Sequence, residues 1–307
     1  MKGFVYVNLT EAQRHRLERA AGIDLTFQAE ENDAAKEALA ASEIAFGNMP
    51  ASWLHDASGL RWVQLESVGF GEYAAFDWSK LSGRLKISNL KGFFAEPVAE
   101  SILAGILSLY RGIATLTKLQ AKAQWAGDQL RPKLKTLNGA SVVLFGYGDI
   151  NRRVEELLVP FGCTVTAFTR DWNNAALEQA LSEADVLICT VPHTPRTAGL
   201  FNAARLGRIK HGAIFANFGR GSLADEQALA DALTSGRLGG AVIDVTQVEP
   251  LPAEHPFWQY PNLILTQHTG GGTRDEIDRK IDVFLSNLAR YRKGEEPLGL
   301  IDVQRGY

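Results

Sequence analysis

A glycine pair in the middle of the chain constrains the fold more than any other feature. The apolar run Val142–Phe145 is short enough for a buried strand, and Gly146, Tyr147 and Gly148 follow it directly. Apolar residues then recur at helical spacing from Ile150. A strand, a glycine turn and a helix in this order bind a pyrophosphate, because N–H groups at the positive helix end face the phosphate oxygens.

The positions of this turn have separate roles. Gly146 permits the tight bend, and Gly148 lets the backbone approach the pyrophosphate. The third glycine of the usual fingerprint is Asn151 here, which weakens the motif without removing the phosphate site; a plain turn is the alternative. We expect the cofactor to contact Gly146, Tyr147, Gly148, Asp149 and Ile150.

Short apolar runs alternate with helical patterns almost throughout the chain. Four candidate strands lie in the first ninety residues: Phe4–Val7, Leu25–Phe27, Ile44–Phe46 and Trp62–Leu65. Six follow from Ser141: Val142–Phe145, Val165–Phe168, Val186–Cys189, Ala213–Asn217, Ala241–Val245 and Leu263–Thr266. This pattern predicts an α/β protein with two doubly wound parallel-sheet domains, a Rossmann cofactor domain and a flavodoxin-like substrate domain, with a cleft between them.

The domain boundaries follow from breaks in this pattern. The alternation stops at Glu96-Pro97, where a long apolar helix begins that we expect to be buried between domains or subunits. We predict a dinucleotide-binding domain over residues 97–286. Because the final helix leads back toward the first domain, we predict a discontinuous substrate-binding domain from residues 1–96 and 287–307.

Composition and charge exclude several classes of protein. Hydrophobic residues make up 46% and charged residues 22% of the 307 residues, as in ordinary soluble enzymes. A net charge of -3 argues against nucleic acid or an anionic membrane as the partner. The N-terminus lacks a signal peptide, and the apolar segment Val98–Tyr110 falls short of the roughly 20 residues of a membrane span. We expect a cytoplasmic protein without a metal site, its two cysteines buried in the core.

The residues after the second strand of the cofactor domain indicate which nicotinamide cofactor binds. NAD enzymes have an acidic residue there, roughly twenty positions beyond the glycines, for the ribose hydroxyls. This chain has Thr169 and Arg170 instead, a hydroxyl and a guanidinium that suit a 2′-phosphate. We therefore predict that NADP(H) is favoured over NAD(H). In the alternative, Arg170 is a solvated surface residue and Asp171 takes the NAD role.

Three polar residues lie in loops that follow strands of the cofactor domain. Arg220, Glu249 and His268 come after the fourth, fifth and sixth predicted strands. Ligands of an open α/β sheet bind at the carboxyl ends of its strands, so the three can converge on the nicotinamide. Arg220 would bind the substrate carboxylate, His268 would exchange a proton with the substrate oxygen, and Glu249 would hold the imidazole and favour its charged form.

These segments together resemble the D-isomer-specific 2-hydroxyacid dehydrogenase family over nearly the whole chain. The shared pattern includes the glycine turn, residues 191–197, the Asn-x-x-Arg-Gly segment around Arg220, residues 249–252 and 256–258, and His268. The resemblance implies that Asp244 contacts the nicotinamide amide and that Val191 and Pro192 lie near the cofactor. We place Phe218, which is in the Arg220 loop, at the same site.

The resemblance also implies a substrate loop and a homodimer. Residues 67–69 resemble the family's substrate loop, whose backbone N–H groups bind the carboxylate, so Val68 and Gly69 are candidate substrate-binding residues with Arg220. Two departures leave the substrate open: Gln267 replaces a proline before the histidine, and Gly71 replaces an acidic residue. Phe70 is a candidate apolar wall of the pocket.

The predicted function is hydride transfer between NADP(H) and a small 2-oxo or 2-hydroxy acid, with glyoxylate or hydroxypyruvate as the expected substrate. Formate oxidation is a related alternative, but in that branch the histidine pairs with glutamine, and Glu249 argues against it. Phosphoglycerate oxidation usually comes with a long regulatory extension after the cofactor domain; because the sequence stops at Tyr307, we do not expect this function. A nucleotide-sensing protein of the corepressor type is an alternative from another class, because such proteins can retain the three residues.

Overall fold

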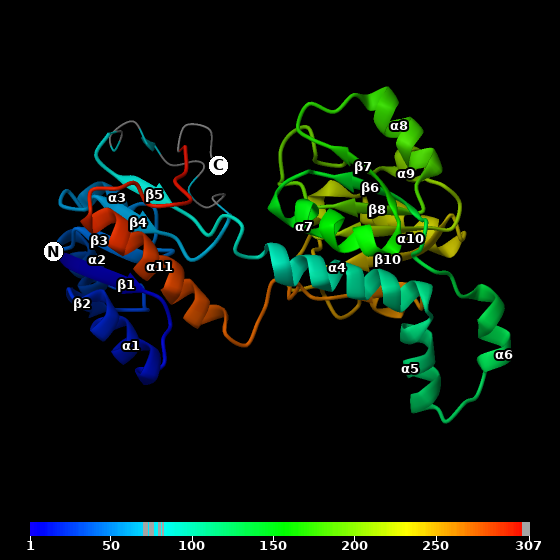
Figure 1. Cartoon of the computed structure of the whole chain (residues 1–307), viewed down its shortest axis with the longest axis horizontal. Helices are drawn as coiled ribbons and strands as arrows, with labels where there is room; N and C mark the ends of the chain where they lie inside the picture. Colours follow the sequence, from blue (N-terminus) through cyan, green and yellow to red (C-terminus); the bar gives the residue numbers. More distant parts are fainter. Residues whose placement is uncertain (70–72, 74–76, 79–80, 82, 303–307) are drawn as a thin grey trace. The chain divides into compact units, whose positions relative to one another are not determined.

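The computed structural model describes residues 1–69, 73, 77–78, 81 and 83–302. The chain forms two compact units, shown in Figure 1. One contains Met1–Phe93 and the chain from Thr273 onward, and the other is Phe94–Gly272. Each unit is built around its own parallel sheet, so the expected α/β class with two parallel-sheet domains is confirmed.

The larger unit, Phe94–Gly272, holds a six-stranded sheet. Its strands lie in the order β11-β10-β9-β8-β6-β7, and every neighbouring pair is parallel. They are β6 (Ser141–Phe145), β7 (Thr164–Phe168), β8 (Val186–Cys189), β9 (Ala213–Asn217), β10 (Leu238–Ile243) and β11 (Leu263–Leu265). The chain passes from β6 to β7 on one side and then returns to β8 on the other. The carboxyl end of β6, where Gly146 lies, is therefore the switch point at which such sheets bind nucleotides.

Helices cover both faces of this sheet because each buries one apolar stripe. Helices α4 (Ala95–Tyr110) and α7 (Asp149–Leu158) pack with Val142 and Leu144 on one face. Helices α8 (Asn174–Glu183), α9 (Ala203–Leu206) and α10 (Glu226–Thr234) cover the other face. Helix α4 packs closely on β10: a Cβ at Gly105 would lie 2.6 Å from Val242 Cγ1. The apolar side chains of α4 therefore form part of the hydrophobic core of this unit.

A helical arm follows α4 along the chain. Figure 1 shows the chain leading away from the sheet of the larger unit along α5 and returning through α6 toward β6. The remaining short helices of this unit are α5 (Ile113–Ala121), α6 (Gly127–Leu130), η3 (Arg131–Lys133), η4 (Val159–Phe161), η5 (Gly221–Leu223) and η6 (Pro256–Gln259). Among the described residues no single helix is long and apolar enough to cross a membrane; only α4 and α5 together, with a 68° bend, reach that length and composition.

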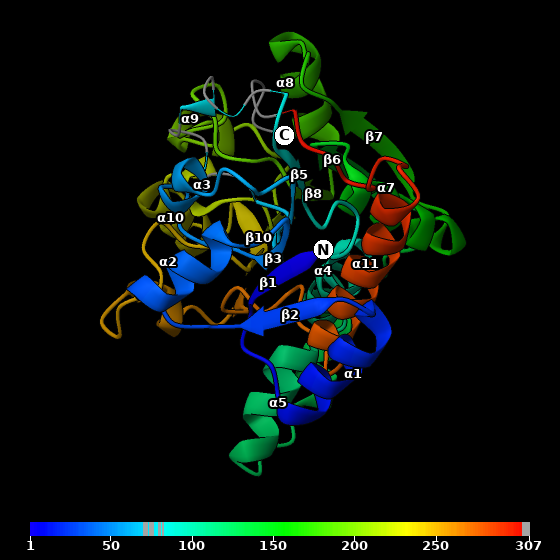
Figure 2. The same cartoon turned by 90° about the vertical axis from the view of Figure 1, so that its left-hand side faces the viewer.

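The smaller unit has a five-stranded parallel sheet in the order β2-β1-β3-β4-β5, which is the flavodoxin-like order. Its strands are β1 (Lys2–Tyr6), β2 (Asp24–Phe27), β3 (Ile44–Gly47), β4 (Trp62–Gln64) and β5 (Lys86–Ser88). Helices α1 (Glu11–Ala21) and α11 (Glu276–Arg292) cover one face, and α2 (Asp33–Ala40) and α3 (Trp53–Asp56) the other (Figure 2). The first four strands were predicted, whereas β5 was missed because its three residues carry a single apolar side chain.

Helix α11 corrects the predicted domain boundary between residues 286 and 287. The whole helix packs in the smaller unit, so the chain crosses at Gly272–Thr273, and the first crossing lies at Phe93–Phe94 rather than after residue 96. Phe284 is buried and stacks on Phe46, with ring centroids 4.8 Å apart. The boundary at residue 286 is wrong because it divides an amphipathic helix whose apolar face packs on one sheet along its whole length.

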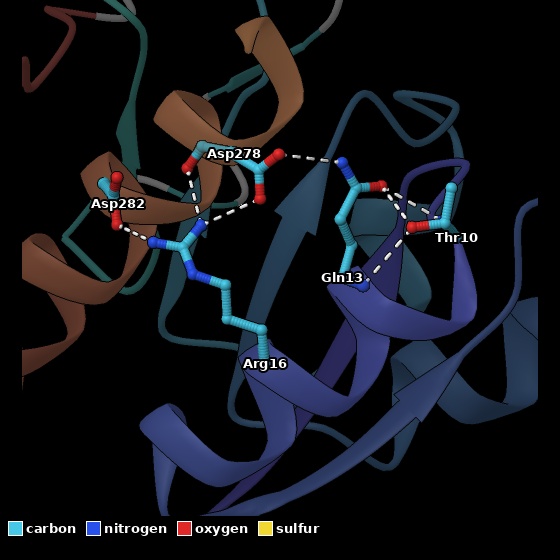
Figure 3. Close-up of polar contacts among 5 residues, drawn as sticks. All are labelled: Thr10, Gln13, Arg16, Asp278 and Asp282. Atoms are coloured by element: carbon cyan, nitrogen blue, oxygen red, sulfur yellow. Dashed lines mark hydrogen bonds and ion pairs between the residues drawn. The ribbon is translucent and has the colours of Figure 1, made fainter.

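Polar contacts fix the first turns of α11 against α1 (Figure 3). The Arg16 guanidinium forms an ion pair with Asp278, Nη1 to Oδ1 at 3.0 Å, and a second ion pair with Asp282. The Gln13 side-chain amide donates to Asp278 Oδ2 at 3.2 Å. Asp278 and Asp282 lie in the part of α11 that was predicted to belong to the dinucleotide-binding domain, residues 97–286.

Candidate active site

The glycine turn has the geometry expected of a phosphate-binding turn. Gly146 has φ +93°, a conformation that favours glycine, and a Cβ there would lie 2.6 Å from Val191 Cγ1. A Cβ at Gly148 would meet no atom within 4 Å, so open space lies in front of the first turn of α7. A side chain at position 148 would occupy the space in which a pyrophosphate can approach the helix N-terminus. The turn therefore fits a dinucleotide.

Asn151 keeps this turn in place although it replaces the third glycine. Its side chain is fully buried, and its amide Nδ2 donates to the Gly146 carbonyl oxygen at 2.6 Å. The Thr190 hydroxyl donates to the same oxygen at 3.2 Å. The sequence indicated a weakened motif, but the structure has a side chain that anchors the turn. Beside it, the Tyr147 hydroxyl donates to Glu155, which raises the pKa of Tyr147.

The other predicted cofactor residues follow the carboxyl ends of the strands. Thr169 and Arg170 come directly after β7 and are exposed, as is Asp171. Val191 follows β8 and is buried against the glycine turn, with exposed Pro192 next to it. Phe218 follows β9 and is buried; a Cβ on Gly270 would lie 2.9 Å from its ring. The structure thus places this whole set along one edge of the sheet.

Glu249 and His268 form the centre of the candidate site. His268 Nδ1 lies 2.7 Å from Glu249 Oε2. The other carboxylate oxygen, Oε1, accepts a hydrogen bond from the Thr246 backbone N–H at 2.9 Å. Because both oxygens are engaged, the carboxylate fixes the orientation of the ring. The imidazole has a side-chain exposure of 55%, and its Nε2 is the nitrogen left for a ligand.

The backbone at His268 adopts an uncommon conformation. Gln267 and His268 have φ of +53° and +56°, in the left-handed region that side-chain-bearing residues rarely occupy. Asp244 holds this segment in place. Its carbonyl accepts from His268 N–H at 2.7 Å, and its Oδ1 accepts from Thr266 Oγ1 at 2.5 Å and from Gly270 N–H at 3.1 Å. The resemblance implied only a cofactor contact for Asp244, so this second role was missed.

Arg220 lies on a loop that packs directly against the Glu249 loop. Its side chain is exposed, and Nη1 donates to the Gly219 carbonyl oxygen at 2.7 Å. A Cβ on Gly221 would lie 2.0 Å from the carbonyl carbon of Thr246, so only glycine allows this approach of the two loops. The loops that carry Arg220, Glu249 and His268 are thus in contact through the backbone at Gly221, Thr246 and Asp244.

Glu226 holds the Glu249 loop by a hydrogen bond to its backbone, a role that the sequence did not predict. Its Oε1 accepts from the Gln247 backbone N–H at 2.8 Å, and its Oε2 lies 3.4 Å from His255 Nε2. His255 Nδ1 accepts from the Phe257 N–H at 3.3 Å, which leaves Nε2 as the ring nitrogen that can donate to Glu226. Nothing in the spacing of Glu226 and His255 in the sequence predicts this contact.

A cavity of about 430 Å³ lies beside the imidazole. It is lined by Asp244, Thr246, Glu249, Pro250, Leu251, Trp258, Leu265, Gln267 and His268. Trp258, whose indole donates to the Pro252 carbonyl oxygen at 2.9 Å, gives the cavity an aromatic wall that was not predicted. The combination of an acid–base pair with apolar walls suits a small polar molecule.

The predicted substrate loop belongs to the smaller unit and is braced by two asparagines. Asn48 Oδ1 accepts from the Glu66 N–H at 3.1 Å, and Asn89 Nδ2 donates to the Val68 carbonyl oxygen at 2.8 Å. The Ser67 hydroxyl donates to the Gly69 carbonyl oxygen at 2.9 Å. Val68 has an exposed side chain. Phe70 and Gly71, which also figured in the predicted pocket, lie outside the described residues.

The residues that the structure describes form neither a metal site nor a reactive cysteine site. In that part of the chain no group of three or more His, Cys, Asp or Glu side chains could hold a metal ion. Cys163 and Cys189 are free cysteines, and burial raises the pKa of both thiols. Neither thiol has the electropositive, exposed setting of a reactive cysteine.

The parallel sheet with its glycine turn defines a dinucleotide-binding protein, and comparison with known proteins identifies the family. Residues 103–270 match the model of the D-isomer specific 2-hydroxyacid dehydrogenase, NAD binding domain. The chain therefore belongs to the D-isomer specific 2-hydroxyacid dehydrogenase family and is an oxidoreductase, and its larger unit is the NAD-binding domain.

Individual relatives agree with this assignment. The chain is 29% identical over 218 residues to a glyoxylate/hydroxypyruvate reductase A of Yersinia enterocolitica, covering 68% of each chain. It is 31% identical over 224 residues to the Arabidopsis thaliana formate dehydrogenase, covering 69% of this chain and 58% of that one. The structure of a D-isomer specific 2-hydroxyacid dehydrogenase from Xanthobacter autotrophicus, in complex with NADPH and MES, superposes with a TM-score of 0.81 at 26% identity, covering 100% and 99% of the chains.

Proposed function

We propose that this protein reduces a small 2-oxo acid such as glyoxylate or hydroxypyruvate with NADPH. The observation that carries the proposal is the Glu249–His268 pair, whose Oε2–Nδ1 distance of 2.7 Å leaves Nε2 to face a ligand. A carboxylate hydrogen-bonded to one imidazole nitrogen fixes the orientation of the ring, and carbonyl reduction needs a proton donor at the other nitrogen.

The chain's own residues would perform the reaction as follows. A dinucleotide held at the glycine turn would supply the hydride that reduces the carbonyl carbon. His268 Nε2 would donate a proton to the carbonyl oxygen, so that the C=O group becomes an alcohol. The Glu249 carboxylate would stabilise the imidazolium until that proton has been transferred. Arg220 binds the carboxylate through its planar guanidinium and polarises the neighbouring carbonyl. In the reverse direction the same imidazole accepts the proton.

The proposed preference for NADPH rests on the residues after β7. Thr169 and Arg170 stand where an NAD enzyme has an acidic residue, and a carboxylate there would repel a 2′-phosphate. The relative from Xanthobacter autotrophicus, whose structure contains NADPH, supports this choice. The carboxylate of Asp171, one position later, is the feature that favours NAD instead.

Two other functions remain candidates within this fold. The similarity to the plant enzyme favours formate oxidation. Glu249 argues against it, because the histidine of a formate dehydrogenase is expected to pair with a neutral amide and His268 pairs with a carboxylate. A nucleotide-sensing protein is the candidate from another class. It would bind the cofactor at the glycine turn without turning over any small acid.

Steady-state assays distinguish these functions. Purified protein should oxidise NADPH with glyoxylate or hydroxypyruvate, at a higher kcat/KM than with NADH, because the guanidinium of Arg170 compensates the phosphate charge. Reduction of NAD⁺ by formate should be absent. Cofactor binding without turnover across a panel of 2-oxo acids would favour the sensor, and a clear NADH preference would contradict the cofactor assignment.

We also propose that the protein is a homodimer that pairs through the helical arm of the larger unit. The arm carries exposed apolar side chains at Ile113, Leu116 and Trp125, the last with 97% of its surface exposed. Apolar side chains gathered on one exposed segment are typical of a protein interface. Light scattering should give the mass of two chains for the wild type, and the change Trp125→Ser should shift the equilibrium toward the monomer. A monomeric wild type would exclude this pairing.

A further inference from the structure

An arginine and a tryptophan from two different loops stack beside the end of β7. The guanidinium carbon of Arg196 lies 4.0 Å from the centroid of the Trp172 ring. The same guanidinium donates through Nη1 to the Arg170 carbonyl oxygen at 2.9 Å. Arg196 belongs to the loop after β8, whereas Arg170 and Trp172 belong to the loop after β7. The stack therefore joins two neighbouring loops at the carboxyl edge of the sheet.

Both partners of the stack are held firmly. The Trp172 ring packs edge-on against Phe145 of β6, with centroids 5.0 Å apart, and its indole donates to Asn174 Oδ1 at 3.2 Å. In the loop of Arg196, the Thr197 hydroxyl donates to the Pro192 carbonyl oxygen at 2.8 Å and accepts from the Thr194 N–H at 2.8 Å. The guanidinium is thus preorganised, so a ligand would lose little conformational entropy by binding to it.

Among the residues that the structure describes, no acidic side chain forms an ion pair with Arg196. Within the described part of the chain its side chain makes the Trp172 stack and the bond to the Arg170 carbonyl, and neither partner is an acid. A guanidinium has five N–H donors, of which one is used here. Stacking on an indole and bonding to a carbonyl leave the full positive charge, with free donors, at an exposed position.

The location of this charge indicates its ligand. In a dinucleotide-binding sheet the adenosine ribose lies at the end of the strand that follows the glycine turn, which is β7 here. Arg196 is bonded to the backbone of Arg170, the residue two positions after that strand. A 2′-phosphate on this ribose would meet the fixed guanidinium of Arg196 together with the side chains of Thr169 and Arg170.

We propose that Arg196, stacked on Trp172, is a specificity-determining residue that binds the 2′-phosphate of NADP(H). This inference rests on the proposed use of NADPH and adds a residue from a second loop to it. Trp172 acts as a positioning residue: it holds the guanidinium in place and makes no contact of its own with the phosphate.

The test measures recognition of the phosphate separately from turnover. Calorimetry on the full chain gives the dissociation constants of two probes, adenosine 2′,5′-bisphosphate and adenosine 5′-monophosphate, which differ by the 2′-phosphate. The change Arg196→Gln should weaken the bisphosphate roughly 10- to 100-fold, the effect of losing a hydrogen bond between charged groups, and should leave the monophosphate nearly unaffected. The ratio of kcat/KM for NADPH to that for NADH should fall by a similar factor.

Further variants separate charge from geometry. Arg196→Lys keeps the charge but loses the planar fork, so it should fall between the wild type and Arg196→Gln. Trp172→Leu should weaken the bisphosphate less than Arg196→Gln does, because the guanidinium remains but is less fixed. Arg208→Gln is the matched control: this arginine of the same unit is exposed, pairs at 3.6 Å with Glu178, and should bind both probes as the wild type does.

Three results would overturn the inference, and they are distinguishable. If Arg196→Gln weakens both probes equally, the residue contacts the adenine or supports the fold instead. If Arg170→Gln loses selectivity for the bisphosphate while Arg196→Gln keeps it, the NADPH assignment stands and the role of Arg196 is wrong. If the wild type does not discriminate between the probes and prefers NADH, the proposed cofactor and the inference fall together.

Discussion

Replacing His268 is expected to lower kcat for 2-oxo acid reduction by about 10²–10⁴-fold, the usual contribution of a positioned general acid. The dissociation constant of NADPH should stay near its wild-type value, because the imidazole faces the cavity and no part of the phosphate turn. Asparagine is the best replacement. Its side chain cannot donate an acidic proton, and it tolerates the left-handed backbone, φ +56°, better than alanine does.

A second variant separates the proton donor from its partner. Glu249→Gln keeps an oxygen that can accept from the Thr246 N–H but removes the negative charge beside the His268 ring. It should lower kcat less than His268→Asn does, and thermal unfolding should show that both variants are folded. Retention of wild-type kcat by folded His268→Asn would show that another group supplies the proton.

Replacing Arg220 is expected to change both steady-state constants. Arg220→Ala should raise KM for the oxo acid and lower kcat by roughly 10²–10³-fold, as for the loss of a group that stabilises developing charge in the transition state. Arg220→Lys should recover part of the binding but less of kcat, because an ammonium group cannot form the two parallel hydrogen bonds that orient a carboxylate. Steady-state kinetics at varied oxo-acid concentration measure both constants.

The split between the two constants identifies the role of Arg220. A rise in KM with unchanged kcat would mean that the arginine binds substrate and transition state equally well, and the proposed polarisation of the carbonyl would be wrong. The control is again Arg208→Gln, an exposed arginine of the same unit that lies in no predicted loop of the site.

Much of the larger unit could be predicted because its strands are buried on both faces. Such strands appear in the sequence as continuous apolar runs, as in Val186–Cys189 and Ala213–Asn217. For this reason the loops that carry Arg220, Glu249 and His268 could be predicted to follow the carboxyl ends of the strands β9, β10 and β11. The glycine turn was also visible in the sequence, and Gly146 has the positive φ that favours glycine. The close approach of Gly221 to the Thr246 backbone was not predicted.

Features that depend on tertiary contacts could not be predicted. Asn151 looked like a weakened fingerprint, because the sequence does not show that its amide reaches the Gly146 carbonyl. The boundary near residue 286 was wrong because periodicity shows that a helix is amphipathic without showing which sheet it covers. The short strand β5 and the contacts of Glu226 and Asp244 likewise depend on neighbours far apart in the chain.

The proposed reaction is direct hydride transfer from the nicotinamide to a 2-oxo acid. It is tested by incubating the wild type with glyoxylate and NADPH that carries deuterium at both C4 positions of the nicotinamide, and analysing the product by mass spectrometry. The product should be glycolate with one carbon-bound deuterium for each NADPH oxidised, and His268→Asn should form almost no labelled glycolate in the same time. Tight binding of NADPH without deuterium in the product, for glyoxylate, hydroxypyruvate and pyruvate alike, would contradict it.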